Sequence, residues 1–303
     1  MTFDLYGKET IMGLFFDYAR PGPGVAPDEP RKTGLPRIWE MISRDFSGFW
    51  RAGMLNLIFT CPFLFGMGFA CATHSLLLAL LTGLLGGLLA APSFLGLADT
   101  LLRSLRDEPG FWWYRYSLAL RRGWKGTLLP GALLGTVFSM QIFTLMHMHL
   151  LGGGLGLFLC QVVSMLLSAG LFTWVLPQQA LLELRFPALV KNSLLLFFRY
   201  LPKTLAAAGI LLAFALAAYL TFPLSAFVLL ATGFWLPLLC AFQIVYPLMD
   251  RVFGIEEQIE KNREHMNDAD GEGSEDSADD ADSTDDQDST NGADSTDNMY
   301  KME

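Results

Sequence analysis

The residues with the clearest potential for chemistry are three histidines near two turns of an otherwise apolar chain. His74 follows Cys71 by three positions, and His147 and His149 alternate with methionines at 146–149. Imidazole, thiolate and thioether groups together suit a soft ion such as Cu(I), or zinc. Against a metal site, a spacing of two points the rings of His147 and His149 apart on a helix. Histidines at a membrane interface also need no metal, and no cofactor is predicted.

Other polar groups within the apolar stretches are uncharged, chiefly Asn56, Gln141, Gln161 and Gln243. Such side chains serve either as hydrogen-bond partners between helices or as ligands along a solute path. Ionisable groups inside a membrane mark proton relays and ion paths, and the predicted spans contain only Arg51, at an edge. No phosphate-binding loop, zinc-protease helix or nucleophile elbow is present in the sequence. Because acid and base groups for catalysis are missing, an enzyme is not predicted.

The composition separates a basic, apolar body from an acidic tail. Of the 303 residues, 52% are hydrophobic and 17% are charged, whereas soluble domains are about 25% charged. The whole chain has 30 acids and 21 bases, and residues 255–303 hold 18 of the acids and 3 of the bases. The remainder therefore has 12 acids and 18 bases, which excludes an ordinary soluble enzyme.

Three stretches without Asp, Glu, Lys or Arg predict membrane-spanning hairpins. They cover residues 52–98, 126–182 and 204–249, with lengths of 47, 57 and 46 residues. A spanning helix needs about 20 apolar residues, so each stretch fits two helices and a turn. The runs are continuous rather than alternating, which favours helices over strands. The predicted spans are 48–69, 76–98, 127–149, 155–177, 203–221 and 225–248, and five spans with one re-entrant hairpin are the alternative.

Within the second predicted span, Gly83, Gly86 and Gly87 are three to four positions apart. Small residues at this spacing let two helix backbones approach closely in a membrane. The spacing therefore predicts a close helix–helix contact on this face.

Aromatic and basic residues gather beside the hairpins, as is typical of segments at the lipid headgroup level. A short amphipathic helix is predicted over 35–51, and the connections at 103–125 and 183–203 carry the same mixture. Its recurrence before each hairpin indicates three copies of one unit, although any helical membrane protein places such residues there. Contacts with anionic lipid or a partner are predicted for Arg103, Arg106, Trp112, Trp113, Arg121, Arg122, Trp124, Lys125, Lys191 and Arg199.

The distribution of bases predicts the topology. All 21 Lys and Arg residues lie outside the three hairpin turns, so the positive-inside rule places both termini and both long connections in the cytoplasm. The predicted organisation is a disordered arm (1–34), a six-helix membrane domain (35–253) and an acidic disordered tail (254–303), which is too polar to offset its ordering entropy. The fold class is an all-α polytopic membrane bundle, with about six helices in three hairpins and amphipathic interfacial helices between them.

In their order along the chain, several of these residues resemble the YesL-like family of bacterial integral membrane proteins. The resemblance covers about residues 14–253, and Ala91 stands where the family usually has glycine. It rests on Arg20-Pro21-Gly22-Pro23-Gly24, Pro92, Ala98, Arg103, Arg106-Asp107-Glu108, Trp112, Trp113, Arg122, Trp124-Lys125 and Val245-Tyr246-Pro247-Leu248-Met249-Asp250-Arg251. Members have no established activity, and the genes of some lie beside those of carbohydrate-uptake transporters. The resemblance implies an accessory role and supplies no catalytic residue.

The favoured function is a non-enzymatic accessory or regulatory subunit in the bacterial cytoplasmic membrane, linked to carbohydrate uptake by the resemblance alone. Its expected partners are the lipid bilayer and either a transporter permease or further copies of the chain, with no nucleic acid. The alternative is a small-solute transporter or channel that works through a cavity of uncharged polar residues.

Overall fold

A computed structural model describes residues 34–108, 111–150, 152, 154–182, 184–259 and 261, which form helices and no strand. Six helices are long and apolar enough to cross a membrane: α2 (Leu35–Ala72), α3 (Leu76–Leu105), α4 (Trp112–Met146), α5 (Leu155–Leu181), α7 (Leu201–Leu220) and α9 (Trp235–Phe253). Two shorter helices are α6 (Phe186–Arg199) and α8 (Leu224–Thr232). The prediction of an all-α, multi-pass membrane bundle is confirmed. The predicted arm as far as residue 33, and the predicted tail from 262 onward, lie outside the described residues. Residues 255–259, at the start of the predicted disordered tail, are helical.

The described residues divide into two compact units, of which the first ends at Tyr246 and the second begins at Pro247. Every helix from α2 to α8 belongs to the first unit, together with the first part of α9. The core of the bundle, its cavities and the ion pairs at the end of α3 all lie within this first unit.

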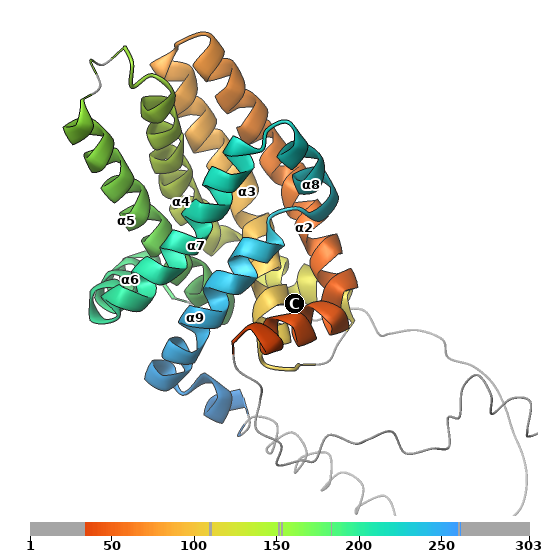
Figure 1. Cartoon of the computed structure of the whole chain (residues 1–303). Coiled ribbons are helices and arrows are strands. Elements are labelled where there is room, and N and C mark those ends of the chain that lie inside the picture. Colours follow the sequence, from red (N-terminus) through yellow and green to blue (C-terminus); the bar gives the residue numbers. More distant parts are fainter. Residues whose placement is uncertain are drawn as a thin grey trace, which may run out of the picture. The chain divides into compact units, whose positions relative to one another are not determined.

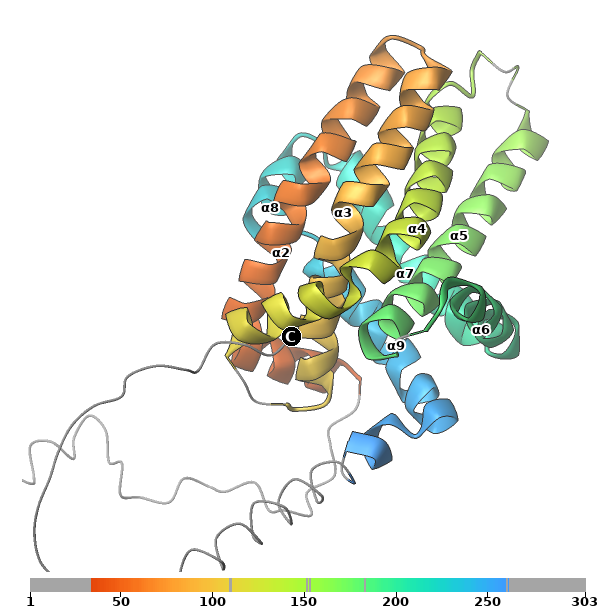
Figure 2. The same cartoon turned by 180° about the vertical axis from the view of Figure 1, so that it is seen from behind.

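The hairpins are arranged so that all their turns lie towards one end of the first unit. In Figures 1 and 2, the turns α2–α3 and α4–α5 lie at the upper end, here named the turn end, and the α7–α8 turn lies in the upper half somewhat below them. The connections α3–α4 and α5–α6 lie at the lower end, here named the connection end. This arrangement separates the turns, which lack Lys and Arg, from the connections, which carry them.

An amphipathic segment precedes each of the three hairpins. Helices α2 and α4 have 38 and 35 residues, well beyond the roughly 20 that span a membrane. Their first turns, red and yellow in Figure 2, run at an angle to the rest of each helix. The third segment is a separate helix, α6, whose buried residues Leu189, Ser193, Leu196 and Phe197 share one face. Helical amphipathic segments are therefore present where they were predicted.

The main apolar core joins α2, α3, α4 and α9. Phe49, Leu101, Tyr116 and Phe242 come from these four helices and are all fully buried. The core thus fixes the amphipathic starts of α2 and α4 against the later part of α3.

Glycine pairs on α3 and α4 bring the backbones of these helices together. A Cβ atom on Gly87 would lie 2.3 Å from the carbonyl oxygen of Gly131, and one on Gly135 would lie 2.6 Å from the Cα of Gly87. A Cβ on Gly83 would lie 2.9 Å from the carbonyl oxygen of Gly135. These distances leave no space for a side chain, so the close packing predicted at these glycines is confirmed. Gly86 faces Phe63 of α2 instead.

The third hairpin differs from the predicted continuous helix over 225–248. Helix α8 ends at Thr232 and α9 begins at Trp235, because Gly233 has a φ of +72° that side-chain-bearing residues rarely adopt. A Cβ on Gly53 of α2 would lie 2.7 Å from the carbonyl oxygen of Thr232. Non-helical backbone is tolerated within a membrane where protein covers it. Because Gly53 has no side chain, α2 can pack directly against the break and cover it. The prediction of one unbroken helix was therefore wrong.

Candidate functional site

Charged side chains at the connection end clamp the start of α2 onto the end of α3. Arg37 Nη2 donates a hydrogen bond to Asp107 Oδ2 at 2.6 Å, and Arg44 pairs with the other carboxylate oxygen. Arg37 also donates to the carbonyl oxygen of Leu105 at 3.4 Å. Two arginines from one helix thus share an acid that lies about 60–70 residues further along the chain.

The charge state of Asp107 follows from these contacts. Burial alone would raise the pKa of its carboxyl group, but hydrogen bonds and charges from Arg44 and Arg37 outweigh burial and hold the pKa below its ordinary value. The carboxylate is therefore ionised at neutral pH, as the clamp requires.

A second group of ion pairs surrounds the end of α3. Arg103 Nε donates to Asp99 Oδ2 at 2.8 Å, and its Nη1 donates to Glu108 Oε2 at 2.8 Å. Arg106 Nε lies 3.1 Å from the other oxygen of Glu108. The side chain of Asp99 is only 5% exposed. The predicted contact residues Arg103 and Arg106 are thus held by acids of their own chain.

The buried ion pair of Asp99 with Arg103 was not predicted from the sequence. The predicted span ended at residue 98, which placed Asp99 in a solvated connection, whereas α3 continues to Leu105. The sequence does place Asp99 and Arg103 four positions apart, a spacing that favours an ion pair on one face of a helix.

The start of α4 presents bases that differ from these clamped arginines. Arg121, Arg122 and Lys125 are exposed, and within the described part of the chain they form no ion pair. Trp124 is 46% exposed, and the Lys125 amine lies 5.7 Å from the centre of its ring. Together with Trp113, which is 62% exposed, these residues are named the basic–aromatic surface.

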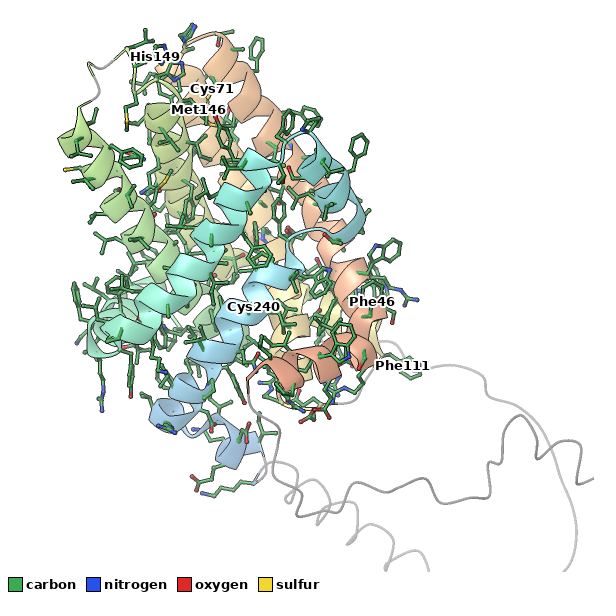
Figure 3. All side chains as sticks on the ribbon, in the orientation of Figure 1. Phe46, Cys71, Phe111, Met146, His149 and Cys240 are labelled. Atoms are coloured by element: carbon green, nitrogen blue, oxygen red, sulfur yellow. The ribbon has the colours of Figure 1, made fainter. Side chains whose placement is uncertain are left out.

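The other predicted contact residues border this surface or lie on α6. Trp112 is half-buried, and the guanidinium of Arg51 lies 6.0 Å from its ring centre. Lys191 and Arg199 are exposed on α6. Figure 3 places Phe111, next to the start of α4, at the connection end, together with Phe46. Exposed aromatic and basic residues at one end match the headgroup level of a bilayer.

Three of the four predicted intramembrane polar residues connect spanning helices to each other. Asn56 is fully buried and donates to Ser93 Oγ at 3.0 Å, which joins α2 to α3. Gln141 donates to Ser164 Oγ at 2.8 Å and Gln161 donates to the carbonyl oxygen of Gln141 at 2.9 Å, which joins α4 to α5. These bonds match the interhelical role that was one of the two predicted interpretations.

Gln243 is the fourth of these polar residues, and Gln141 and Gln161 have a second feature in common. Gln243 donates to the carbonyl oxygen of Gly34 at 2.9 Å, which ties α9 to the start of α2. Gln141 and Gln161 also border a crevice of about 330 Å³ between α4 and α5. Predicted polar residues from two helices thus line a common space.

The structure brings two of the three candidate metal ligands together at the turn end. His147 Nε2 lies 2.7 Å from His74 Nδ1, and its Nδ1 lies 2.8 Å from the carbonyl oxygen of Phe143. A distance of 2.7 Å is that of a direct hydrogen bond, which leaves no room for a metal between the two nitrogens. His149 is exposed at the same end as Cys71 and Met146 (Figure 3). No group of three His, Cys, Asp or Glu side chains able to hold a metal occurs among the described residues.

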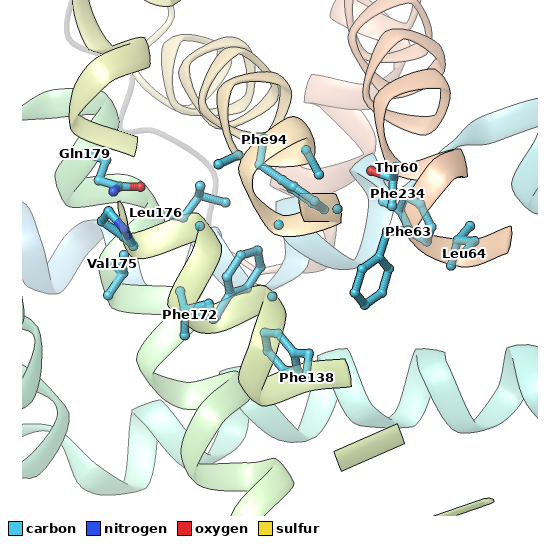
Figure 4. A pocket seen from close by; sticks show the side chains of 18 of the residues that line it. Thr60, Phe63, Leu64, Phe94, Phe138, Phe172, Val175, Leu176, Gln179 and Phe234 are labelled. Carbon is cyan, nitrogen blue, oxygen red and sulfur yellow. The ribbon is translucent and has the colours of Figure 1, made fainter. Parts of the chain in front are cut away.

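A cavity of about 290 Å³ lies within the bundle and is named the apolar groove. Figure 4 shows its labelled side chains, of which only Thr60 and Gln179 are polar. Phe94, Phe138 and Phe172 form its aromatic wall, with Phe172 in edge-to-face contact with both of the others. The sequence reasoning did not find this groove, because its lining comes from four helices and Phe234.

Comparisons with family models, with curated proteins and with solved structures find no match for this chain.

Proposed function

We propose that this multi-pass membrane protein is a non-enzymatic accessory or regulatory subunit in the bacterial cytoplasmic membrane, and that a partner docks on its basic–aromatic surface. The observation that carries the proposal is the contrast between two sets of bases. Arg103 and Arg106 are neutralised by Asp99 and Glu108, whereas the bases at 121, 122 and 125 are exposed without an ion pair in the part described. Exposed bases beside exposed indole rings suit an acidic partner surface or anionic headgroups.

A permease of a carbohydrate-uptake transporter is the partner that we favour. The resemblance to the YesL-like family supports this choice. The side-chain amides of Asn56 and Gln161 donate hydrogen bonds to neighbouring helices, a use that favours helix packing over a sugar path. The apolar groove likewise offers no site for a sugar.

The proposal requires the connection end to face the cytoplasm, and cysteine labelling tests this orientation. Single cysteines at Thr73 and Thr221, both exposed at hairpin turns, should react with a membrane-impermeant thiol reagent added to intact cells. A cysteine at exposed Tyr114 should react only after lysis. The background lacks the native Cys61, Cys71, Cys160 and Cys240. The opposite pattern would show that the chain is inserted the other way round.

Reversal of the bases in the basic–aromatic surface should weaken docking. The triple variant Arg121→Glu, Arg122→Glu and Lys125→Glu is expected to lose most of the co-purified partner, because like charges would then face each other across the interface. If the contact is instead anionic lipid, the loss should be about 1 kcal/mol per base. The matched control, Arg121→Lys, Arg122→Lys and Lys125→Arg, keeps all three charges and should retain the partner. Equal recovery by both variants would remove this surface from the proposal.

A small-solute transporter or channel is the second candidate, and two observations favour it. The crevice at Gln141 and Gln161 is bordered by several residues with uncharged polar side chains, although most of its surface is apolar. The break at Gly233 interrupts the third hairpin, as discontinuous helices do in many transporters. The purified chain in liposomes separates the two candidates. Uptake of a labelled sugar by these liposomes, without any partner, would contradict the accessory role. No uptake above that of protein-free liposomes would support it.

A further inference from the structure

The apolar groove has a lining that suits hydrocarbon and not water. Its walls come from α2, α3, α4 and α5, all of spanning length, and Phe234 borders it. A buried water needs two to four polar partners, and the lining side chains offer only Thr60 and Gln179. The hydroxyl of Thr60 already donates to the carbonyl oxygen of Asn56 at 2.8 Å.

The groove is open to the surroundings of the bundle. Leu64 on its rim is 44% exposed, and for a spanning helix those surroundings are lipid. A hydrocarbon chain can therefore enter sideways from the bilayer without crossing a polar barrier.

The length of the groove matches one leaflet. Along α4 its lining runs from Pro130 to Ile142, which at about 1.5 Å per residue is about 18 Å. Half of a hydrocarbon core that is about 30 Å thick measures about 15 Å. The groove is thus long enough for the acyl chain of one lipid.

One polar atom in the groove indicates which way round a bound lipid lies. Gln179 Nε2 is buried and has no hydrogen-bond partner among the described residues. The residue lies two positions before the end of α5, towards the connection end, while Ile142 lies towards the turn end. An unpaired amide N–H at one end of an apolar groove fits an amphiphile whose acceptor oxygen lies at that end.

We propose that the apolar groove binds one acyl chain of a phospholipid from the leaflet at the connection end, and that Gln179 Nε2 donates a hydrogen bond to its ester carbonyl. The aromatic wall of Phe94, Phe138 and Phe172 encloses the chain. This site is separate from the basic–aromatic surface, so it stands whether or not the accessory role holds.

Native mass spectrometry of the full-length chain tests the proposal, after extraction from vesicles of phosphatidylethanolamine and phosphatidylglycerol. Leu134→Trp fills the groove, while Leu133→Trp adds the same ring at the neighbouring position, which is 50% exposed and does not line the groove. Wild type and Leu133→Trp should retain one phospholipid through detergent washing. Leu134→Trp should retain about tenfold less, a factor that corresponds to about 1.4 kcal/mol.

A second variant tests the site even if Leu134→Trp fails to fold. Gln179→Leu removes the donor and keeps the shape, so its bound phospholipid should also decrease while its melting temperature stays near that of wild type. Equal phospholipid retention by Leu133→Trp and Leu134→Trp would overturn the proposal. Retention of a single-chain fatty acid in place of a phospholipid would overturn it as well.

Discussion

Replacement of Gly131 by alanine is expected to destabilise the protein by about 1–3 kcal/mol, the usual cost of overpacking a tight contact. The new Cβ would lie 2.2 Å from the Cβ of Ala91 and 2.9 Å from the carbonyl oxygen of Gly87. Neither is the end of a flexible side chain, so α3 and α4 must move apart along their shared glycine face. The greater helix propensity of alanine offsets at most about 1 kcal/mol.

Gly126→Ala is the matched control because Gly126 lies on the same helix and nothing lies within 4 Å of its Cβ position. It should leave the free energy of unfolding unchanged or raise it by up to about 1 kcal/mol. Both variants are measured by titrating the protein in mild detergent with a denaturing detergent. If Gly131→Ala were as stable as Gly126→Ala, the close contact of α3 with α4 would be refuted.

Arg103→Met is expected to cost about 3 kcal/mol of stability, the lower end of the range for breaking a buried ion pair. The substitution leaves Asp99, with a side chain only 5% exposed, without its 2.8 Å partner. The lower end applies because the side chain of Arg103 is itself 23% exposed. The same variant separates a structural role for Arg103 from a docking role, since the basic–aromatic surface remains intact.

The double variant Asp99→Leu, Arg103→Met provides the control for this effect. It removes both charges, and Glu108 keeps its contact with Arg106, so most of the lost stability should return. Partner recovery per folded molecule should stay at the wild-type level in Arg103→Met. Wild-type stability of Arg103→Met, combined with loss of the partner, would assign Arg103 to docking instead.

The sequence was sufficient for the features that depend on local composition. Uncharged stretches of 46 to 57 residues predicted hairpins, since only paired helices can bury so many apolar residues in a bilayer. The glycines on α3 predicted a close contact because small residues serve that purpose in membranes. Their partners, Gly131 and Gly135, needed the structure, since the sequence does not say which helix faces which.

Features that depend on tertiary contact could not be predicted. Arg37 and Asp107 are 70 positions apart, and only the folding of α2 against α3 brings them together. The helix break at Gly233 lies in a continuous apolar run, where a single glycine is compatible with an unbroken helix. His74 and His147 were both expected near the turns, but their hydrogen bond depends on how two helix ends approach.

In-cell crosslinking from the basic–aromatic surface tests the accessory role most directly. A photo-crosslinking amino acid replaces Trp124 in the full-length chain, with a control at Leu133, which is 50% exposed on the same helix, and the crosslinked products are identified by mass spectrometry. A transporter permease recovered in near-stoichiometric yield from position 124, and not from position 133, is the predicted result. Recovery of this chain alone, or only of further copies of it, would contradict the accessory role and favour a self-sufficient transporter or channel.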